Sequence, residues 1–252
     1  AMPTGNWNLG FLFSTGFRAP NVDDIAKIFD SEPGNVVVPN PDLAPEYSYN
    51  IEGRIAKTIM ERLQFQAVFF TSFFREAIAR RDYTFNRQDS IFYDGTLSRV
   101  QALLNVGRSN IYGGHIGLKA QITPSWSLSS YLNYTSGHDL DEDIPLRHTT
   151  PLFGHTSIAY RAKKIKAELE VRYNGKRSFE ELPPSEQNKT HLYTDDGSLA
   201  WYTINLRGSY KIKNFIRIHA DIENILDQHY RPYSSGISAA GRNAILSVYA
   251  DF

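Results

Sequence analysis

An alternation of apolar and polar residues with a period of two recurs along the chain and constrains its fold more than any other feature. The cleanest stretch is 165–175, with one face formed by Ile165, Ala167, Leu169, Val171 and Tyr173 and the other by Lys166, Glu168, Glu170, Arg172 and Asn174. The pattern returns three times between residue 201 and the end of the sequence. Because successive side chains of a β-strand point to opposite faces, it predicts strands with one apolar and one polar face.

Applied to the whole sequence, the pattern predicts ten strands. They are 7–17, 47–57, 63–75, a glycine-punctuated strand ending at 116–122, then 126–137, 152–161, 165–175, 201–210, 216–223 and 243–252. Most have about 10 to 13 residues, which suits a tilted crossing of a bilayer better than the short strands of soluble sheets. No stretch approaches 18 apolar residues, so a transmembrane helix is not expected.

Alternation alone fits a soluble sandwich, with the apolar face inward, or an outer-membrane barrel, with that face toward lipid. The nine connections decide between them, because they alternate between short turns of three to five residues and long loops of about 14 to 29. Outer-membrane barrels have short periplasmic turns and long external loops, whereas sandwiches vary loop length at both ends. The sequence therefore predicts an all-β, antiparallel transmembrane β-barrel.

Composition excludes several other classes. Lys and Arg number 27 and Asp and Glu also number 27, so the chain has no basic field suited to nucleic acid. Cysteine is absent, which excludes a disulfide scaffold, a thiolate metal site and a cysteine nucleophile.

Aromatic residues stand near the strand ends, as expected for girdles at a membrane interface: Trp7, Phe17, Trp126, Tyr134, Tyr173, Trp201 and Tyr210.

Four short motifs stand at the ends of these strands. They comprise Phe17, Arg18, Ala19 and Pro20; Asn40, Pro41, Asp42 and Leu43; Glu223 and Asn224 with Tyr230 and Arg231 after them; and Gly241–Asn243 with the terminal Phe252. In sequence and in order they resemble motifs of the TonB-dependent outer-membrane receptors. The resemblance extends from residue 17 to residue 252.

The resemblance implies a 22-stranded barrel, plugged by an N-terminal domain and coupled to an inner-membrane energy complex by a short box. Residues 1–252 would be its C-terminal portion, although the even strand count also allows a smaller closed barrel. The implied partners are outer-membrane lipid, the TonB complex through the missing N-terminal part, the barrel-insertion machinery through the strand ending at Phe252, and a small metal chelate. No cofactor and no catalysis are implied.

Side chains in and near the long loops are candidates for ligand contact: Arg18, Tyr93, Arg99, His138, Tyr193, Arg231 and Tyr233. Arginine and tyrosine bind anionic chelates through charge-assisted hydrogen bonds and stacking. A ferric siderophore fits this chemistry, and cobalamin, a glycan or a peptide remain alternatives. Residues 21–39 contain no histidine, which counts against haem, although His138, His148 and His155 keep that alternative open.

The same motif residues have structural explanations. Arg18 can pair with a carboxylate in the lumen, Pro20 can end a strand because it lacks an N–H, and Asn40 and Asp42 are ordinary turn residues. Glu223, with Asp221, can be neutralised by Arg217 on the same face.

Two other kinds of site fit parts of the sequence less well. The acidic stretch 139–143 offers oxygen ligands for calcium, but it lacks the spacing of a known loop, so the metal is unknown and a solvated acidic face is favoured. A ten-stranded outer-membrane protease would draw on His138 with Asp139, or on His191 with Asp195 and Asp196. An enzyme of this kind leaves the four motifs unexplained, so a transporter is preferred.

Overall fold

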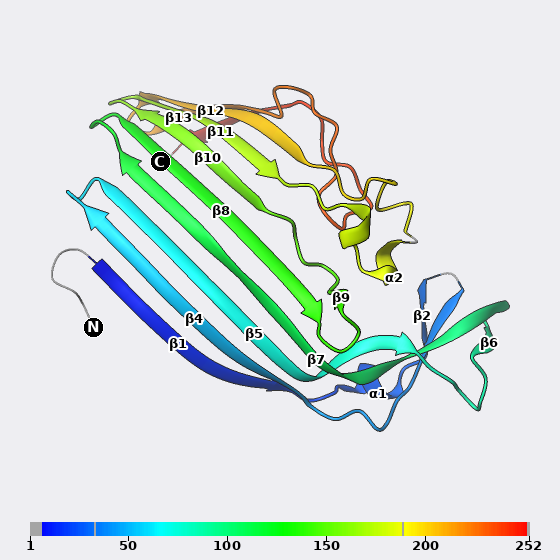
Figure 1. The fold of residues 1–252 in the computed structure, drawn as a ribbon. Coiled ribbons are helices and arrows are strands. Elements are labelled where there is room, and N and C mark those ends of the chain that lie inside the picture. Colours follow the sequence, from blue (N-terminus) through cyan, green and yellow to red (C-terminus); the bar gives the residue numbers. More distant parts are fainter. Residues whose placement is uncertain (1–6, 33, 188, 251–252) are drawn as a thin grey trace.

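The computed structural model describes residues 7–32, 34–187 and 189–250, and one large sheet dominates them (Figure 1). Ten strands follow one another across the sheet in chain order, and each is antiparallel to the next. They are β1 (Trp7–Arg18), β4 (Glu46–Ile59), β5 (Leu63–Asp82), β7 (Thr96–Gln121), β8 (Trp126–Asp139), β10 (Phe153–Arg161), β11 (Ile165–Asn174), β12 (Trp201–Lys213), β13 (Ile216–Glu223) and β14 (Asn243–Ala250). The predicted all-β fold and its ten main strands are confirmed.

The sheet is open in the described part of the chain. Its order begins at β1 and ends at β14, and these two strands do not pair with each other. The strands curve together into a trough, with short turns at one end and long loops at the other (Figure 1). Below, these are called the short-turn end and the long-loop end.

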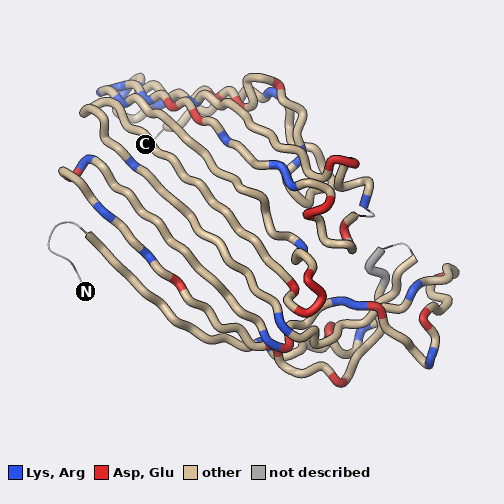
Figure 2. The backbone as a smooth tube through the Cα atoms, in the orientation of Figure 1, with Lys and Arg blue, Asp and Glu red and all other residues tan. Residues whose placement is uncertain are grey.

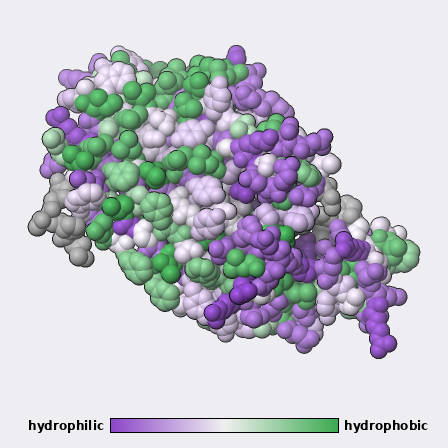
Figure 3. Space-filling view, viewed as in Figure 1, coloured by the Kyte–Doolittle hydropathy of each residue, from purple (hydrophilic) through white to green (hydrophobic). Residues whose placement is uncertain are grey.

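One face of the sheet is apolar and exposed. Phe11 and Leu246 expose 77% and 73% of their surface, and Leu169 and Val248, which a soluble sandwich would bury, expose 43% and 64%. Hydrophobic side chains gather over the strands, and hydrophilic ones gather over the long-loop end (Figure 3). On the opposite face of β12, Thr203 and Asn205 are buried. A sheet with its apolar face uncovered and polar groups on its concave side is the arrangement of a barrel wall.

The long polar loop that the sequence predicts directly after the strand 63–75, over about 76–98, is largely β-structure, so that prediction was wrong. The strands β5 and β7 have 20 and 26 residues and extend far beyond the predicted 10 to 13. Between them, β6 (Ser90–Tyr93) pairs with the start of β7 through a turn at Asp94 and Gly95, whose φ angles are 45° and 77°. Two positive φ angles are typical of tight β-hairpin turns.

The first long loop also contains regular structure that the sequence did not predict. It holds α1 (Val22–Ala26), β2 (Phe29–Glu32) and β3 (Asn35–Val38), and β3 runs parallel to β7. Val36, Val38, Val100 and Ala102 form a small buried core there, against which Tyr93 packs. We call the part formed by β2, β3, β6 and the adjoining ends of β5 and β7 the flange.

The remaining elements are short and lie at the long-loop end. They are β9 (Ile144–Pro145), the 3-10 helix η1 (Phe179–Glu181) and α2 (Pro184–Gln187). Among the described residues, no helix has the length and apolar character needed to cross a membrane.

Candidate functional site

Arg18 of the first motif ends β1 and joins this strand to α1 and to the start of β4. Its Nη1 lies 2.9 Å from Asp24 Oδ2 and its Nε lies 2.8 Å from Glu46 Oε1. Asp24 and Asn21 cap α1 reciprocally, each side chain accepting a backbone N–H of the other residue. The other oxygen of Glu46 accepts the backbone N–H of Ile78 at 2.9 Å. Arg18 thus has the ion-pairing role that the sequence offered as its structural explanation.

The second motif forms the turn that leads into β4. The buried Asn40 donates its side-chain amide to the carbonyl of Leu103 at 2.8 Å and accepts the N–H of Asp42 at 3.1 Å. Asn105 of β7 accepts the N–H of Ala44 at 2.8 Å and donates to its carbonyl at 2.9 Å. This turn therefore packs on β7, and the bond from Asn40 to Leu103 joins residues that are more than 60 positions apart in the sequence.

The third motif starts the loop between β13 and β14. Asn224 is buried and has a φ of 50°. Its side-chain amide accepts the backbone N–H of Gln228 and donates to the carbonyl of the same residue, each at 2.9 Å. Its own N–H donates to Asn205 Oδ1 of β12 at 2.9 Å. The cation beside Glu223 is Arg207, at 3.6 Å, rather than the Arg217 that the sequence suggested. Phe252 lies outside the described residues.

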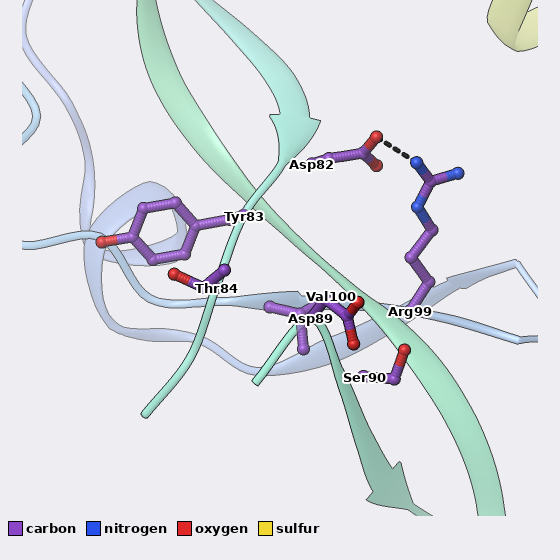
Figure 4. A pocket seen from close by; sticks show the side chains of 7 residues that line it. All are labelled: Asp82, Tyr83, Thr84, Asp89, Ser90, Arg99 and Val100. Carbon is purple, nitrogen blue, oxygen red and sulfur yellow. Dashed lines mark hydrogen bonds and ion pairs between the residues drawn. The ribbon is translucent and has the colours of Figure 1, made fainter. Parts of the chain in front are cut away.

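A polar cavity of about 630 Å³ opens on the flange (Figure 4). Its lining consists of Asp82, Tyr83, Thr84, Asp89, Ser90, Arg99 and Val100. Arg99 forms an ion pair with Asp82, and its side chain remains 63% exposed. The predicted contact residue Arg99 therefore borders a space that a ligand can enter, whereas Tyr93 packs against the flange core.

A second cluster joins the loops that follow β8, β11 and β13. At its centre Glu186 of α2 is fully buried, accepts the hydroxyl of Tyr193 at 2.7 Å, and lies 3.3 Å from Arg147 Nε. The Tyr193 hydroxyl also lies 3.2 Å from that of Ser234, which in turn lies 3.0 Å from His148 Nδ1. We call these five residues the loop hub. Burial, with the hydrogen bond to Glu186, raises the pKa of Tyr193.

The other two predicted residues of this region border the loop hub. The ring of Tyr233 lies 6.0 Å from that of Tyr193 and carries the Arg177 guanidinium 5.9 Å above it. Its buried hydroxyl has no hydrogen-bond partner among the described residues, and burial raises its pKa. Arg231 donates to the backbone carbonyls of His191 and Leu192, at 2.5 and 3.4 Å. The structure thus brings Tyr193, Arg231 and Tyr233 together, in contacts between loops.

The acidic stretch after β8 is bound by cationic side chains. Arg81 contacts Asp139 at 2.5 Å and Glu142 at 2.9 Å, and Arg108 contacts Asp141 at 3.1 Å. The backbone N–H of Arg108, then its guanidinium, hold the pKa of Asp141 below its usual value. These contacts give the carboxylates partners other than a metal, and the described residues contain no cluster of three or more potential metal ligands.

His138, the remaining predicted contact residue, lies beside this stretch. Its Nε2 lies 3.4 Å from Asp143 Oδ1, and its side chain is 40% exposed. Asp139, which the protease alternative paired with His138, instead contacts Arg81. Likewise Asp196 of the second alternative lies 3.8 Å from Lys176.

Sequence reasoning missed the centre of the loop hub. Glu186 and Arg147 lie in polar loops without periodicity, so nothing in the alternation marks them. One local signal was present, because Pro184 opens α2 and Glu186 lies in its first turn, positions that proline and acidic residues favour.

Comparison with known proteins agrees with this architecture. A family model described as "TonB dependent receptor-like, beta-barrel" matches residues 2–225. The iron-regulated outer membrane virulence protein of Vibrio cholerae is 26% identical over 253 residues, covering 94% of this chain and 37% of that protein. The chain therefore spans well under half the length of this curated relative.

Solved structures of low sequence identity share the fold. A ferric enterobactin receptor mutant from Pseudomonas aeruginosa, in complex with enterobactin, matches with a TM-score of 0.78 at 16% identity, covering 100% of this chain and 39% of that one. The siderophore receptor PirA from Acinetobacter baumannii gives 0.76 at 15% identity, covering 98% and 39%. The copper transporter OprC gives 0.75 at 18%, covering 100% and 38%. With its motifs, open β-sheet and family match over residues 2–225, this chain belongs to the TonB-dependent receptor β-barrel family of the bacterial outer membrane.

Proposed function

We propose that residues 1–252 are the C-terminal portion of the barrel of a TonB-dependent receptor that takes up a metal chelate, with a ferric siderophore as the favoured ligand. The observation that carries the ligand class is the iron-regulated relative, which aligns with 94% of this chain. Two of the structures that share the fold are described as receptors for a siderophore or for ferric enterobactin. Copper, haem and cobalamin are the competing cargoes.

The open sheet supports a larger barrel. In hydrocarbon every unpaired backbone N–H or C=O costs several kcal/mol, so transmembrane sheets close on themselves. The edge strands β1 and β14 do not pair with each other in the described chain, which leaves two edges for further strands. In the family those strands and a plug precede this region, and we propose that the TonB complex acts through that N-terminal part.

The long-loop end supplies chemistry suited to an anionic chelate. Arg99 projects beside the flange cavity with its guanidinium largely exposed, so it can donate to ligand oxygens without opening the fold. His138 also keeps an exposed ring near the mouth of the barrel. Tyr193 and Arg231 instead hold the loops in position, since the first is buried and the second binds backbone carbonyls.

Uptake by the full-length receptor tests the proposal. A strain lacking its own siderophore receptors, complemented with the receptor, is grown under iron limitation with one iron source at a time. Ferric enterobactin, other ferric siderophores, haem and ferric citrate form one panel, and cobalamin and copper are supplied in separate dependence assays. Growth on at least one ferric siderophore is expected, and dependence on haem, cobalamin or copper alone would overturn the proposed ligand class.

Arg99→Ala tests the contact itself. Loss of one charge-assisted hydrogen bond, worth about 1.5 kcal/mol or more, is expected to weaken binding of the transported chelate about tenfold. Arg87→Ala is the matched control, because Arg87 is an exposed arginine in the nearby turn between β5 and β6 and does not line the cavity. Equal affinities of both variants and the parent receptor, measured by fluorescence quenching, would remove Arg99 from the binding site.

A further inference from the structure

The short-turn end of the sheet carries a strong excess of cations. This end comprises the turns β4–β5, β7–β8, β10–β11 and β12–β13, together with the three residues on each side of each turn. This region holds ten of the 27 Lys and Arg residues but only one of the 27 Asp and Glu residues, Glu61. The clustering of basic residues at the strand ends opposite the long loops is visible in Figure 2.

These cations lack acidic partners, unlike those at the other end. Arg18, Arg81 and Arg108 at the long-loop end each lie within 3.1 Å of a carboxylate oxygen. Within the described chain, none of the ten basic residues at the short-turn end lies in an ion pair. Their charge is therefore not neutralised by neighbouring parts of the sheet.

Five of these cations stand on the outer side of the sheet or in the turns that project beyond the strand ends. Lys57 lies opposite Trp7 on the apolar face, with its Nζ 4.2 Å from the indole centroid. Arg62, Lys163 and Lys164 are exposed in the turns, and Lys213 stands 5.7 Å from the ring centroid of Phe215. We call these five residues the outer basic rim.

The other five cations alternate to the concave face. Strand register pairs Arg161 with Lys166 and Lys211 with Arg217, on the side of the sheet that carries the polar residues. Lys119 lies on the same side, 5.7 Å from the Tyr131 ring centroid. These residues form an inner set of equal number and charge, facing the lumen rather than lipid.

The outer basic rim lies at the depth of lipid headgroups. Trp126 and Tyr160 pack against each other on the apolar face with ring centroids 4.9 Å apart, and such aromatic pairs mark the boundary of the hydrocarbon layer. Lys163 follows Tyr160 by three residues, at the tip of the turn between β10 and β11, which places it at most about 10 Å beyond Tyr160 along the strand direction and at most about 7 Å in depth at a tilt of 45°. A headgroup layer of about 5 to 8 Å occupies that depth.

We propose that the outer basic rim binds the phosphate groups of anionic phospholipids in the periplasmic leaflet of the outer membrane. The short turns of such barrels face the periplasm, so the rim meets phospholipid at that surface. Unpaired lysines at headgroup depth attract anionic lipid while their aliphatic stems lie along the aromatic belt. The proposal rests on the outer-membrane location of the family and is independent of which chelate is carried.

The test uses the full-length receptor, purified in a mild detergent and offered equal amounts of phosphatidylglycerol and phosphatidylethanolamine. Native mass spectrometry counts the lipids that remain bound, and a preference for phosphatidylglycerol that declines with added salt is expected. Removing one rim lysine is expected to reduce this preference about fivefold. The triple variant Lys163→Gln, Lys164→Gln and Lys213→Gln is expected to lose it almost completely.

The inner set provides a matched control. The triple variant Lys119→Gln, Lys166→Gln and Lys211→Gln removes the same charge from the lumen side and is expected to keep the lipid preference. Equal losses in the two triple variants, or an undiminished preference in the rim variant, would overturn the proposal. The single variants Lys163→Gln and Lys164→Gln, each with its expected fivefold loss, decide the question if a triple variant fails to fold.

Discussion

Replacing Glu186 with alanine tests whether the loop hub holds three long loops together. The substitution removes a fully buried carboxylate that accepts the Tyr193 hydroxyl at 2.7 Å and lies 3.3 Å from Arg147. The three loops then lose the only acidic group at the centre of their described contacts. We expect them to open locally while the strands stay paired, because the hub lies beyond the strand ends.

The expected size of the effect follows from the two contacts. A hydrogen bond from a hydroxyl to a buried carboxylate contributes about 1.5 to 3 kcal/mol, and the partly exposed Arg147 adds at most about 1 kcal/mol. Removing the charge also relieves its desolvation, which offsets part of this loss. A net decrease of about 2 to 3 kcal/mol in the free energy of loop opening corresponds to roughly 30- to 150-fold. Glu186→Gln keeps a neutral acceptor for Tyr193, so about fivefold is expected.

Hydrogen exchange in the full-length receptor measures this opening. The N–H groups of Leu192 and Tyr193 donate to the carbonyl of Lys189, at 2.9 and 3.0 Å, and report on the loop directly. Their protection is expected to decrease by the factors above, whereas amides in the middle of β11 keep theirs. Glu180→Gln is the control, because Glu180 is exposed in the same loop. Protection within threefold of the parent in Glu186→Ala, or an equal loss in Glu180→Gln, would refute the reasoning.

Two further predictions concern the long-loop end. Arg18→Ala removes the ion pairs to Asp24 and Glu46. We expect α1 to open about tenfold more often, a modest effect because Arg18 is partly exposed and water screens its ion pairs. The control Lys27→Ala breaks only the exposed 3.8 Å pair with Asp23 and should leave hydrogen exchange in α1 unchanged. Asp141 has a lowered pKa, so its contribution is present above its ordinary pKa and is lost as pH decreases through the lowered value. The N–H of Leu140 donates to the carbonyl of Arg108, so its protection from hydrogen exchange, corrected for intrinsic exchange, should decrease below about pH 4. The Asp141→Asn variant should not show this pH dependence. Protection that is independent of pH in the parent protein would contradict the prediction.

The membrane-spanning part of the fold was predictable because lipid imposes a period on the sequence. Each crossing strand must present every second side chain to hydrocarbon, so Leu169 and Val248 identify their faces without knowledge of neighbouring strands. The short turns follow from the same constraint, since neighbouring antiparallel strands need only a few residues to reverse. The observed turns at 60–62 and 162–164 lie where the alternation breaks.

The flange was not predictable in this way. Beyond the membrane the two faces of β5 and β7 meet water or other loops, so no constraint alternates their side chains. The parallel pairing of β3 with β7 joins Asn35 to Arg99 across more than 60 residues, and a single sequence contains no local signal for such a contact. Buried polar groups such as Glu186 are hidden for the same reason, because their burial depends on loops that meet only in the folded chain.

In the candidate site, the motif residues are distinct from the side chains that are placed to contact a ligand. The motif residues Arg18, Asn40 and Asn224 lie where the sheet passes into loops, and each bonds backbone groups or charges that a strand end leaves unpaired. Their chemistry fixes the direction in which a loop leaves the barrel, and none of the three lines the flange cavity. Arg99 and His138 stand outside the motifs, in segments whose sequence is free to change with the ligand. The motifs therefore identify the scaffold, and the identity of the chelate has to be determined at side chains that the resemblance does not cover.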